Sequence, residues 1–169
     1  MIVGQPGSGK STLARALGNA TGLPVVHIDQ LLWQSDWIQR PRLEVDVLCR
    51  EAHARPRWII EGGHSSTWEE RLERCDMLIW LDVPLATRSL RVLRRTFRFH
   101  GHARPDLPPG CPERFDLEFL IWIWSTRKTA REKMKRLYER VPAGKARFRL
   151  VTFAEVDGFL REFGGATRS

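Results

Sequence analysis

The segment that most constrains the fold is Gly4-Gln5-Pro6-Gly7-Ser8-Gly9-Lys10-Ser11, which fits the pattern G-x-x-x-x-G-K-[ST] without a gap. A short apolar stretch, residues 1–3, precedes it, and good helix formers, residues 12–17, follow it. Glycines allow positive φ, so successive backbone N–H groups can point at an anion, and the start of the helix adds a favourable dipole. The pattern predicts a phosphate-binding loop from Gly4 to Thr12.

Two side chains of this loop have expected roles. The Lys10 ammonium can reach the β- and γ-phosphates of a nucleoside triphosphate, and the Ser11 hydroxyl can ligate Mg²⁺. A GTPase is disfavoured because the chain has no Asn-Lys-x-Asp guanine motif. The expected cofactors are therefore ATP and Mg²⁺.

Short apolar stretches alternate with helical patterns along the rest of the chain. The expected strands are residues 25–28, 58–60, 77–81 and 147–152, and the expected helices are residues 43–54, 85–99, 112–140 and 155–163. This alternation predicts an α/β fold, a doubly wound five-stranded parallel sheet flanked by helices, in a single domain over residues 1–169.

Acidic residues follow three of the expected strands, at the edge where parallel sheets bind ligands. They are Asp29, Glu61 and Asp82. Asp29 and Glu61, with Ser11, are candidate Mg²⁺ ligands, and either carboxylate could orient the hydroxyl of an acceptor. The alternative for both is a helix cap or a turn residue.

Basic residues exceed acidic ones, 28 to 20, for a net charge of +8. Four arginines spaced three, four and three residues apart share one face of the expected helix 85–99: Arg88, Arg91, Arg95 and Arg98. Leu90, Leu93 and Phe97 are expected to form the buried stripe of this helix. No acid lies between Arg88 and Arg104, so the row predicts an anion nearby. We expect Arg95, Arg98 and Arg104 to neutralise charge in a phosphoryl-transfer transition state. The alternative is a solvated basic face.

Between two expected helices, residues 99–111 lack periodic apolar positions and are predicted to form a short lid over the substrate. The longest apolar run, Phe119–Trp124, is too short for a membrane helix, which needs roughly 20 residues. Three cysteines without CxxC spacing and an N-terminus without a signal pattern favour the cytoplasm.

The chain resembles the nucleoside monophosphate kinase-like P-loop proteins, and more narrowly the adenylate kinase-related group often labelled DNA topology modulation proteins. The phosphate loop and four further segments carry this resemblance: His27-Ile28-Asp29, Trp58-Ile59-Ile60-Glu61-Gly62, Leu81-Asp82-Val83-Pro84 and Arg104-Pro105-Asp106. It implies that Arg91 packs on adenine, that Arg95 touches the phosphates and that the turn at Thr152 lies beside the base. It also implies an acceptor-binding insert at about residues 30–57. Segment 61–65 lacks the arginine with which adenylate kinases hold their acceptor, so the acceptor is not named by the resemblance.

The leading hypothesis is an ATP-dependent phosphotransferase that moves the γ-phosphoryl group to a nucleotide or another small acceptor. Two alternatives stay open. One is a nucleic-acid-associated ATPase or regulator that uses the positive charge to hold the phosphodiester backbone and stacks bases on Trp33, Trp37 and Trp68. The other is an ATP-binding protein without kinase activity. No sequence pattern indicates an oligomeric state.

Overall fold

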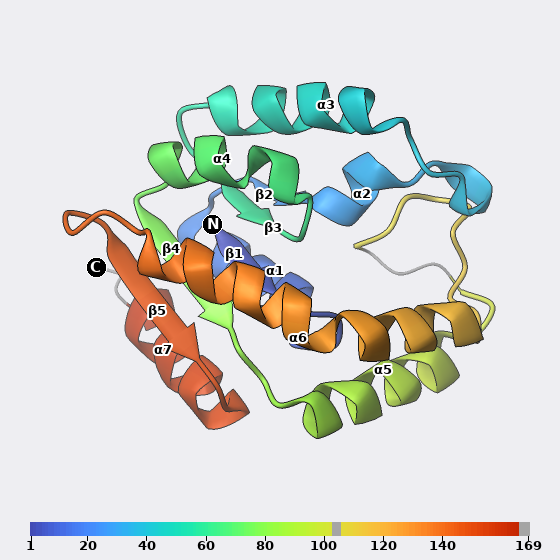
Figure 1. Cartoon of the computed structure of the whole chain (residues 1–169). Coiled ribbons are helices and arrows are strands. Elements are labelled where there is room, and N and C mark those ends of the chain that lie inside the picture. The colour runs from blue at the N-terminus through green and yellow to red at the C-terminus, as the bar shows by residue number, and fades with distance from the viewer. Residues whose placement is uncertain (103–105, 166–169) are drawn as a thin grey trace.

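The computed structural model describes residues 1–102 and 106–165 (Figure 1). Its centre is one parallel sheet with the strand order β2-β3-β1-β4-β5. The strands are β1 (Ile2–Gly4), β2 (Val25–His27), β3 (Ile59–Glu61), β4 (Met77–Leu81) and β5 (Ala146–Leu150). The predicted doubly wound five-stranded sheet is confirmed, and β1 lies at its centre, with β3 and β4 on its two sides.

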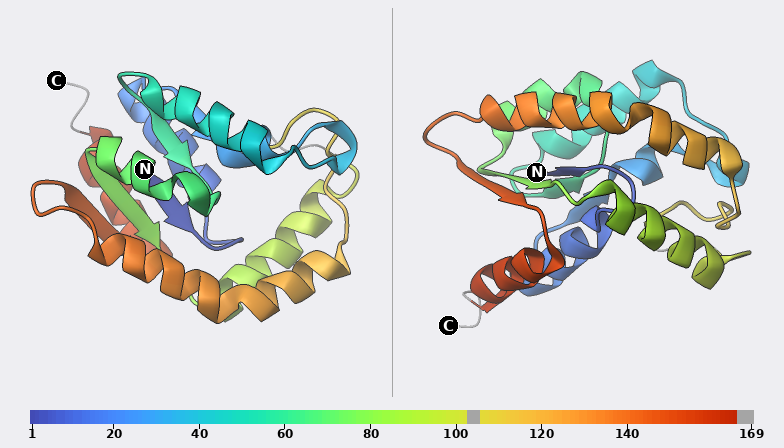
Figure 2. Two further views of the ribbon diagram at one scale, coloured as in Figure 1. Left: turned by 45° about the horizontal axis from the view of Figure 1, so that its top comes forward. Right: turned by 60° about the horizontal axis from the view of Figure 1, so that its bottom comes forward.

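Seven α-helices and two short 3₁₀ helices surround the sheet in the described residues. They are α1 (Lys10–Thr21), α2 (Ile28–Leu32), η1 (Ser35–Trp37), α3 (Arg42–Ala54), η2 (Ser65–Thr67), α4 (Trp68–Arg74), α5 (Leu85–Phe99), α6 (Leu117–Glu139) and α7 (Phe153–Gly165). Figure 2 shows α1 and α7 on one face of the sheet and α3, α4 and α6 on the other. Within the described ranges, none of the helices has the length and apolarity that a membrane span requires.

Alternation along the strands builds two cores, one on each face. Met1, Val3, Leu78 and Trp80 pack with residues of α4 and α6, whereas Ile2, Ile79 and Leu81 pack with α1 and α7. A third cluster buries α2 and α3 against β3. The sheet is therefore covered on both faces, and loops border its carboxyl edge, which is where parallel sheets generally bind ligands.

Several expected boundaries move by one or two residues: the strands expected at 58–60 and 147–152 are Ile59–Glu61 and Ala146–Leu150, and the helix expected at 155–163 is Phe153–Gly165. Two further changes have a clear local reason. The strand expected over residues 25–28 ends at His27, because Ile28 and Asp29 begin α2. The helix expected from Pro112 begins at Leu117 instead. Its cap is Asp116, whose carboxylate accepts a hydrogen bond from the Phe119 N–H at 2.9 Å. The expected N-terminal turn from Pro112 is therefore wrong.

The buried face of α5 is also not the one expected. Arg88, Val92 and Thr96 are buried, whereas Leu90 is 55% and Phe97 is 78% exposed. The reason is close packing against the phosphate loop: a Cβ added at Gly7 would lie 2.3 Å from the Arg88 carbonyl oxygen and 2.9 Å from Val92 Cγ2. A face with Leu90 and Phe97 inward would not bring Arg88 behind this loop.

Candidate functional site

The phosphate loop has the backbone that its sequence predicts. Gly7 has φ 79° and Gly9 has φ 97°, both in the left-handed region that favours glycine. Gly9 caps α1, so Lys10 and Ser11 open the helix. Two long side-chain contacts hold the loop from behind: Arg88 Nη1 donates to the Pro6 carbonyl at 3.3 Å, and Gln5 Nε2 donates to the Arg127 carbonyl at 2.9 Å.

The loop opens into a large cavity of about 1120 Å³. All loop residues from Gly4 to Thr12 line it except Ser8, which is buried with its Oγ lacking a hydrogen bond among the described atoms. Asp29 and a row of arginines from α5 also line the cavity: Arg91, Arg94, Arg95 and Arg98. Lys10, Ser11, Asp29 and the expected arginines of α5 other than Arg88 are thus brought together around one space.

Glu61, the other expected Mg²⁺ ligand, lies elsewhere. It is 2% exposed and its Oε1 is 2.6 Å from His27 Nδ1, in a buried contact between β2 and β3. Glu61 is not among the residues lining the large cavity. Its role as a metal ligand stays a prediction.

The oxygen atoms available beside the phosphate loop suit Mg²⁺ better than a metal ion that takes all its ligands from the protein. The described residues contain no group of three or more His, Cys, Asp or Glu that could hold a metal ion. Mg²⁺ usually keeps several waters and takes one or two protein ligands together with substrate phosphates. Ser11 and Asp29, which line the same cavity, fit that mode.

Arg91 and the turn after β5 meet beside the start of α1. The Arg91 guanidinium carbon lies 4.1 Å from the centre of the Phe153 ring, a cation–π contact. A Cβ added at Gly9 would lie 3.6 Å from Arg91 and 3.7 Å from Phe153. Thr152 uses its hydroxyl to accept from the Glu155 N–H at 3.2 Å, so its expected contact with a nucleotide stays a prediction.

The arginine row is less uniformly positive than the sequence indicates. Arg95 contacts Glu113 at 3.2 Å, and Thr96 Oγ1 donates to the same carboxylate at 3.2 Å. Glu113 is buried at the foot of the expected lid, so an acid from outside the helix compensates part of the row. Arg98 is exposed at the cavity. Arg104 lies outside the described residues.

The described part of the expected lid, residues 99–102 and 106–111, is joined to the chain around η1. Ser35 Oγ donates to the Pro109 carbonyl, the Asp36 N–H donates to the Gly110 carbonyl, and Cys111 Sγ donates to the Gln34 carbonyl. Figure 1 shows this segment running from the ends of α5 and α6 toward η1. One side of the cavity is therefore bridged from the arginine helix to the expected acceptor insert.

His64 is a feature that the sequence leaves as an ordinary loop histidine. Its Nε2 lies 2.5 Å from Asp46 Oδ1, and Ser66 Oγ donates to the same oxygen at 2.6 Å. These hydrogen bonds, first Ser66 and then His64, lower the pKa of Asp46. His64 has φ 57°, unusual for a residue with a side chain, and it lines the large cavity. His64 and Ser66 thus anchor this segment to α3. Segment 61–65 is the one that lacks the acceptor-binding arginine of adenylate kinases.

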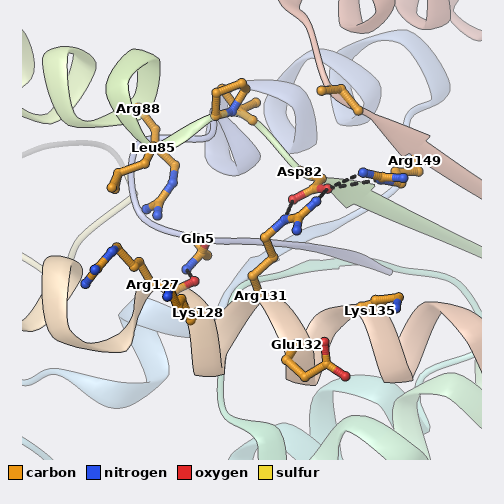
Figure 3. Close-up of a pocket in the computed structure, with 13 residues that line it drawn as sticks. Gln5, Asp82, Leu85, Arg88, Arg127, Lys128, Arg131, Glu132, Lys135 and Arg149 are labelled. Carbon is orange, nitrogen blue, oxygen red and sulfur yellow. Dashed lines mark hydrogen bonds and ion pairs between the residues drawn. The ribbon is translucent and has the colours of Figure 1, made fainter.

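Asp82 is the third carboxylate at the sheet edge, and arginines from two other elements engage it. Arg131 approaches from α6 with contacts of 2.7 and 2.8 Å, and Arg149 approaches from β5 with contacts of 2.7 and 3.0 Å (Figure 3). Burial raises the pKa of Asp82, but the hydrogen bonds from the two guanidinium groups outweigh it and lower the pKa overall. Asp82 is therefore an ionised anchor between α6 and β5.

We expect Asp82→Asn to lower the free energy of unfolding by about 1–2 kcal/mol at pH 7, because charge-assisted hydrogen bonds to both arginines are lost. A carboxyl with a lowered pKa contributes stability above its unfolded pKa of about 3.9, and loses it as pH falls through the folded value. The gap between parent and variant should therefore close in acid. Urea unfolding from pH 7 to pH 3 measures it, and a gap that is independent of pH would contradict the ion pairs.

Comparisons with known proteins agree with this geometry. A family model described as "ATPase family associated with various cellular activities (AAA)" matches residues 1–60, which contain the phosphate loop. A shikimate kinase from Acinetobacter baumannii, solved in complex with shikimate, superposes with a TM-score of 0.60 over 99% of this chain and 93% of that chain, at 16% identity. The chain has a kinase-like P-loop fold. An uncharacterized protein from Eubacterium ventriosum shares the fold at a TM-score of 0.50 and 13% identity, over 96% of this chain and 95% of that one.

A curated relative is closer in sequence. The cytidylate kinase of Pyrobaculum aerophilum is 33% identical over 109 residues, which cover 56% of this chain and 58% of that protein. The chain thus matches less than two thirds of the relative's length. This similarity supports a nucleotide-kinase-like P-loop protein and leaves the acceptor open.

Proposed function

We propose that the chain is an ATP-dependent phosphotransferase that moves the γ-phosphoryl group of ATP to a nucleotide or another small acceptor. The observation that carries the proposal is that the phosphate loop, Asp29 and four arginines of α5 line one cavity: Arg91, Arg94, Arg95 and Arg98. A phosphoryl group in transfer spreads charge over its oxygens, so catalysis needs cations placed on several sides of it.

The candidate site residues divide into four roles under this proposal. Lys10 and the loop backbone bind the β- and γ-phosphates, and Ser11 and Asp29 hold Mg²⁺, which when bound neutralises phosphate charge. Arg95 and Arg98 face the group in transfer, with Arg104 in the same role as an expectation. Arg91 and Phe153 bind the adenine. Glu61 positions His27 and the end of β2, and ligates Mg²⁺ only if the loop rearranges when ATP binds.

The walls of the cavity support an acceptor that has a ring and an anionic group. Five phenylalanine and tryptophan side chains line it together with Arg94 and Arg114: Trp33, Trp37, Phe99, Phe119 and Trp122. Aromatic faces favour planar rings, and guanidinium groups favour phosphate or carboxylate. The name of the relative, cytidylate kinase, supports nucleoside monophosphates as the first acceptors to test.

The test is a panel of acceptors incubated with γ-labelled ATP and Mg²⁺: the nucleoside monophosphates, then small hydroxy acids and alcohols. We expect label in one acceptor or one chemical class, well above hydrolysis. Hydrolysis that no acceptor accelerates and that DNA stimulates would instead favour the nucleic-acid-associated ATPase. ATP binding with neither hydrolysis nor transfer would favour a protein without kinase activity.

A further inference from the structure

A second cavity of about 510 Å³ lies behind the phosphate loop, between the start of α5, the middle of α6 and the carboxyl ends of β4 and β5 (Figure 3). Its apolar lining residues are Val83, Pro84, Leu85 and Val151. Gln5 lines both cavities, so one segment of the loop separates them. The proposed phosphotransfer gives this second cavity no role.

The lining is strongly cationic. Two acidic side chains, Asp82 and Glu132, face six basic ones from three elements: Arg88, Arg127, Lys128, Arg131, Lys135 and Arg149. Asp82 is already shared by Arg131 and Arg149, and Glu132 accepts from Arg136, which is outside the lining. The cations around the cavity therefore exceed the charge that the protein supplies to balance them.

Two of these cations have no acidic partner among the described residues. Arg127 stacks on Trp124, with 4.0 Å from its guanidinium carbon to the ring centre, and donates to the Trp124 carbonyl. Lys128 follows it on α6 and has no hydrogen bond or ion pair with any described residue. Because Arg127 is already oriented, an anion there would not have to order that side chain.

Arg88 is the strongest indication of a ligand. It is 2% exposed, its Nε has no hydrogen-bond partner among the described residues, and its one hydrogen bond is the 3.3 Å contact to Pro6. Burial lowers the pKa of Arg88. A buried guanidinium with unused donors is costly unless an anion approaches it. Figure 3 shows its side chain reaching from α5 toward the loop, on the same side of the cavity as Arg127.

We infer that this cavity binds a small polyanion with at least two phosphate groups, between Arg88 and Arg127 with Lys128. Guanidinium forks match phosphate oxygens, and the volume falls in the range of small-ligand sites, roughly 300–1000 Å³. The recess favours a compact ligand over the extended backbone of a nucleic acid, which needs a groove or a stripe of charge. Because Arg88 also holds Pro6, the ligand would contact the back of the ATP-binding loop.

Inorganic pyrophosphate is a suitable probe, measured by isothermal titration calorimetry without Mg²⁺ or ATP. The parent protein should bind two equivalents, one at the phosphate loop and one in the second cavity. Lys10→Ala should lose the first and keep the second. Arg127→Gln with Lys128→Gln should weaken the second at least 10-fold and keep the first.

A charge-matched control separates a site from general attraction. Arg57→Gln with Lys133→Gln likewise removes two positive charges; both residues are exposed, and neither lines either cavity. It should leave both affinities within about twofold. The inference is overturned if the parent binds one equivalent, if Lys10→Ala removes all binding, or if the two double variants lose the same affinity. It is also overturned if Arg127→Gln with Lys128→Gln weakens binding of a single-stranded oligonucleotide but not of pyrophosphate.

The readout is independent of the proposed phosphotransfer, because no turnover is measured. If the protein binds two equivalents of pyrophosphate but phosphorylates no acceptor, the second site is supported and the proposed phosphotransfer fails. Equal thermal unfolding midpoints of the two double variants and the parent show that any lost binding does not come from unfolding.

Discussion

Lys10→Ala should weaken binding of ATP by about 100-fold or more and remove detectable phosphotransfer. The ammonium group is expected to contact two phosphates, and each hydrogen bond between charged groups contributes about 1.5–3 kcal/mol. Removal of a single hydrogen bond of this strength already corresponds to a roughly 10- to 100-fold change in affinity. Equilibrium binding of a fluorescent ATP analogue measures the effect directly, without reference to an acceptor.

Lys133→Ala is the matched control, because Lys133 is exposed on α6 and lines neither cavity. It should bind the analogue like the parent. If Lys10→Ala also keeps the parental affinity, the loop is not the site of the triphosphate, and both the assignment of Lys10 and the proposed phosphotransfer fail together.

Gly7→Ala should unfold or distort the phosphate loop, at a cost of about 3 kcal/mol in the free energy of unfolding. An L side chain in the left-handed region costs about 1–2 kcal/mol, and forced overpacking adds about 1–3 kcal/mol. Both apply at Gly7, where φ is 79° and the added carbon would lie 2.3 Å from the Arg88 carbonyl oxygen. Because α5 must move to make room, ATP binding should be lost as well.

Gly22→Ala measures the cost of a side chain in the left-handed region alone, without the cost of overpacking. Gly22 has φ 70°, close to that of Gly7, but nothing lies within 4 Å of an added carbon. It should cost about 1 kcal/mol and leave ATP binding intact. Chemical unfolding and analogue binding of both variants give the comparison. Equal stability losses at the two positions would contradict the close packing of α5 on the loop.

Much of the fold follows from local pattern. The apolar run of β4 and the Val83-Pro84 turn set the bounds of β4 and α5, and both were predicted to the residue, Met77–Leu81 and Leu85–Phe99. The phosphate loop is equally local, because its glycines permit the left-handed backbone that Gly7 and Gly9 adopt. These elements need few distant partners to decide their conformation.

The parts that the sequence misses depend on distant residues. Asp82 follows β4, just as Asp29 was expected to follow its strand. Only the folded chain brings Arg131 and Arg149 to Asp82, because they lie 49 and 67 residues farther along the sequence. Pro112 and Glu113 satisfy local preferences for a helix start, yet Glu113 instead contacts Arg95 and Thr96 on α5. The inward face of α5 is likewise decided by the loop against which it packs, since its arginines and leucines alone allow either orientation.

Under the proposed function, the contact between Arg91 and Phe153 bears on which base the ATP site would accept. Stacking on a guanidinium and a phenyl ring is favourable for any flat heterocycle, whereas telling adenine from guanine requires hydrogen bonds to the ring edge. Neither of these two side chains carries an acceptor atom, and the Arg91 guanidinium already lies over the Phe153 ring. Discrimination among purine triphosphates as phosphoryl donors should therefore be shallow, and set by backbone groups of the adjoining turn.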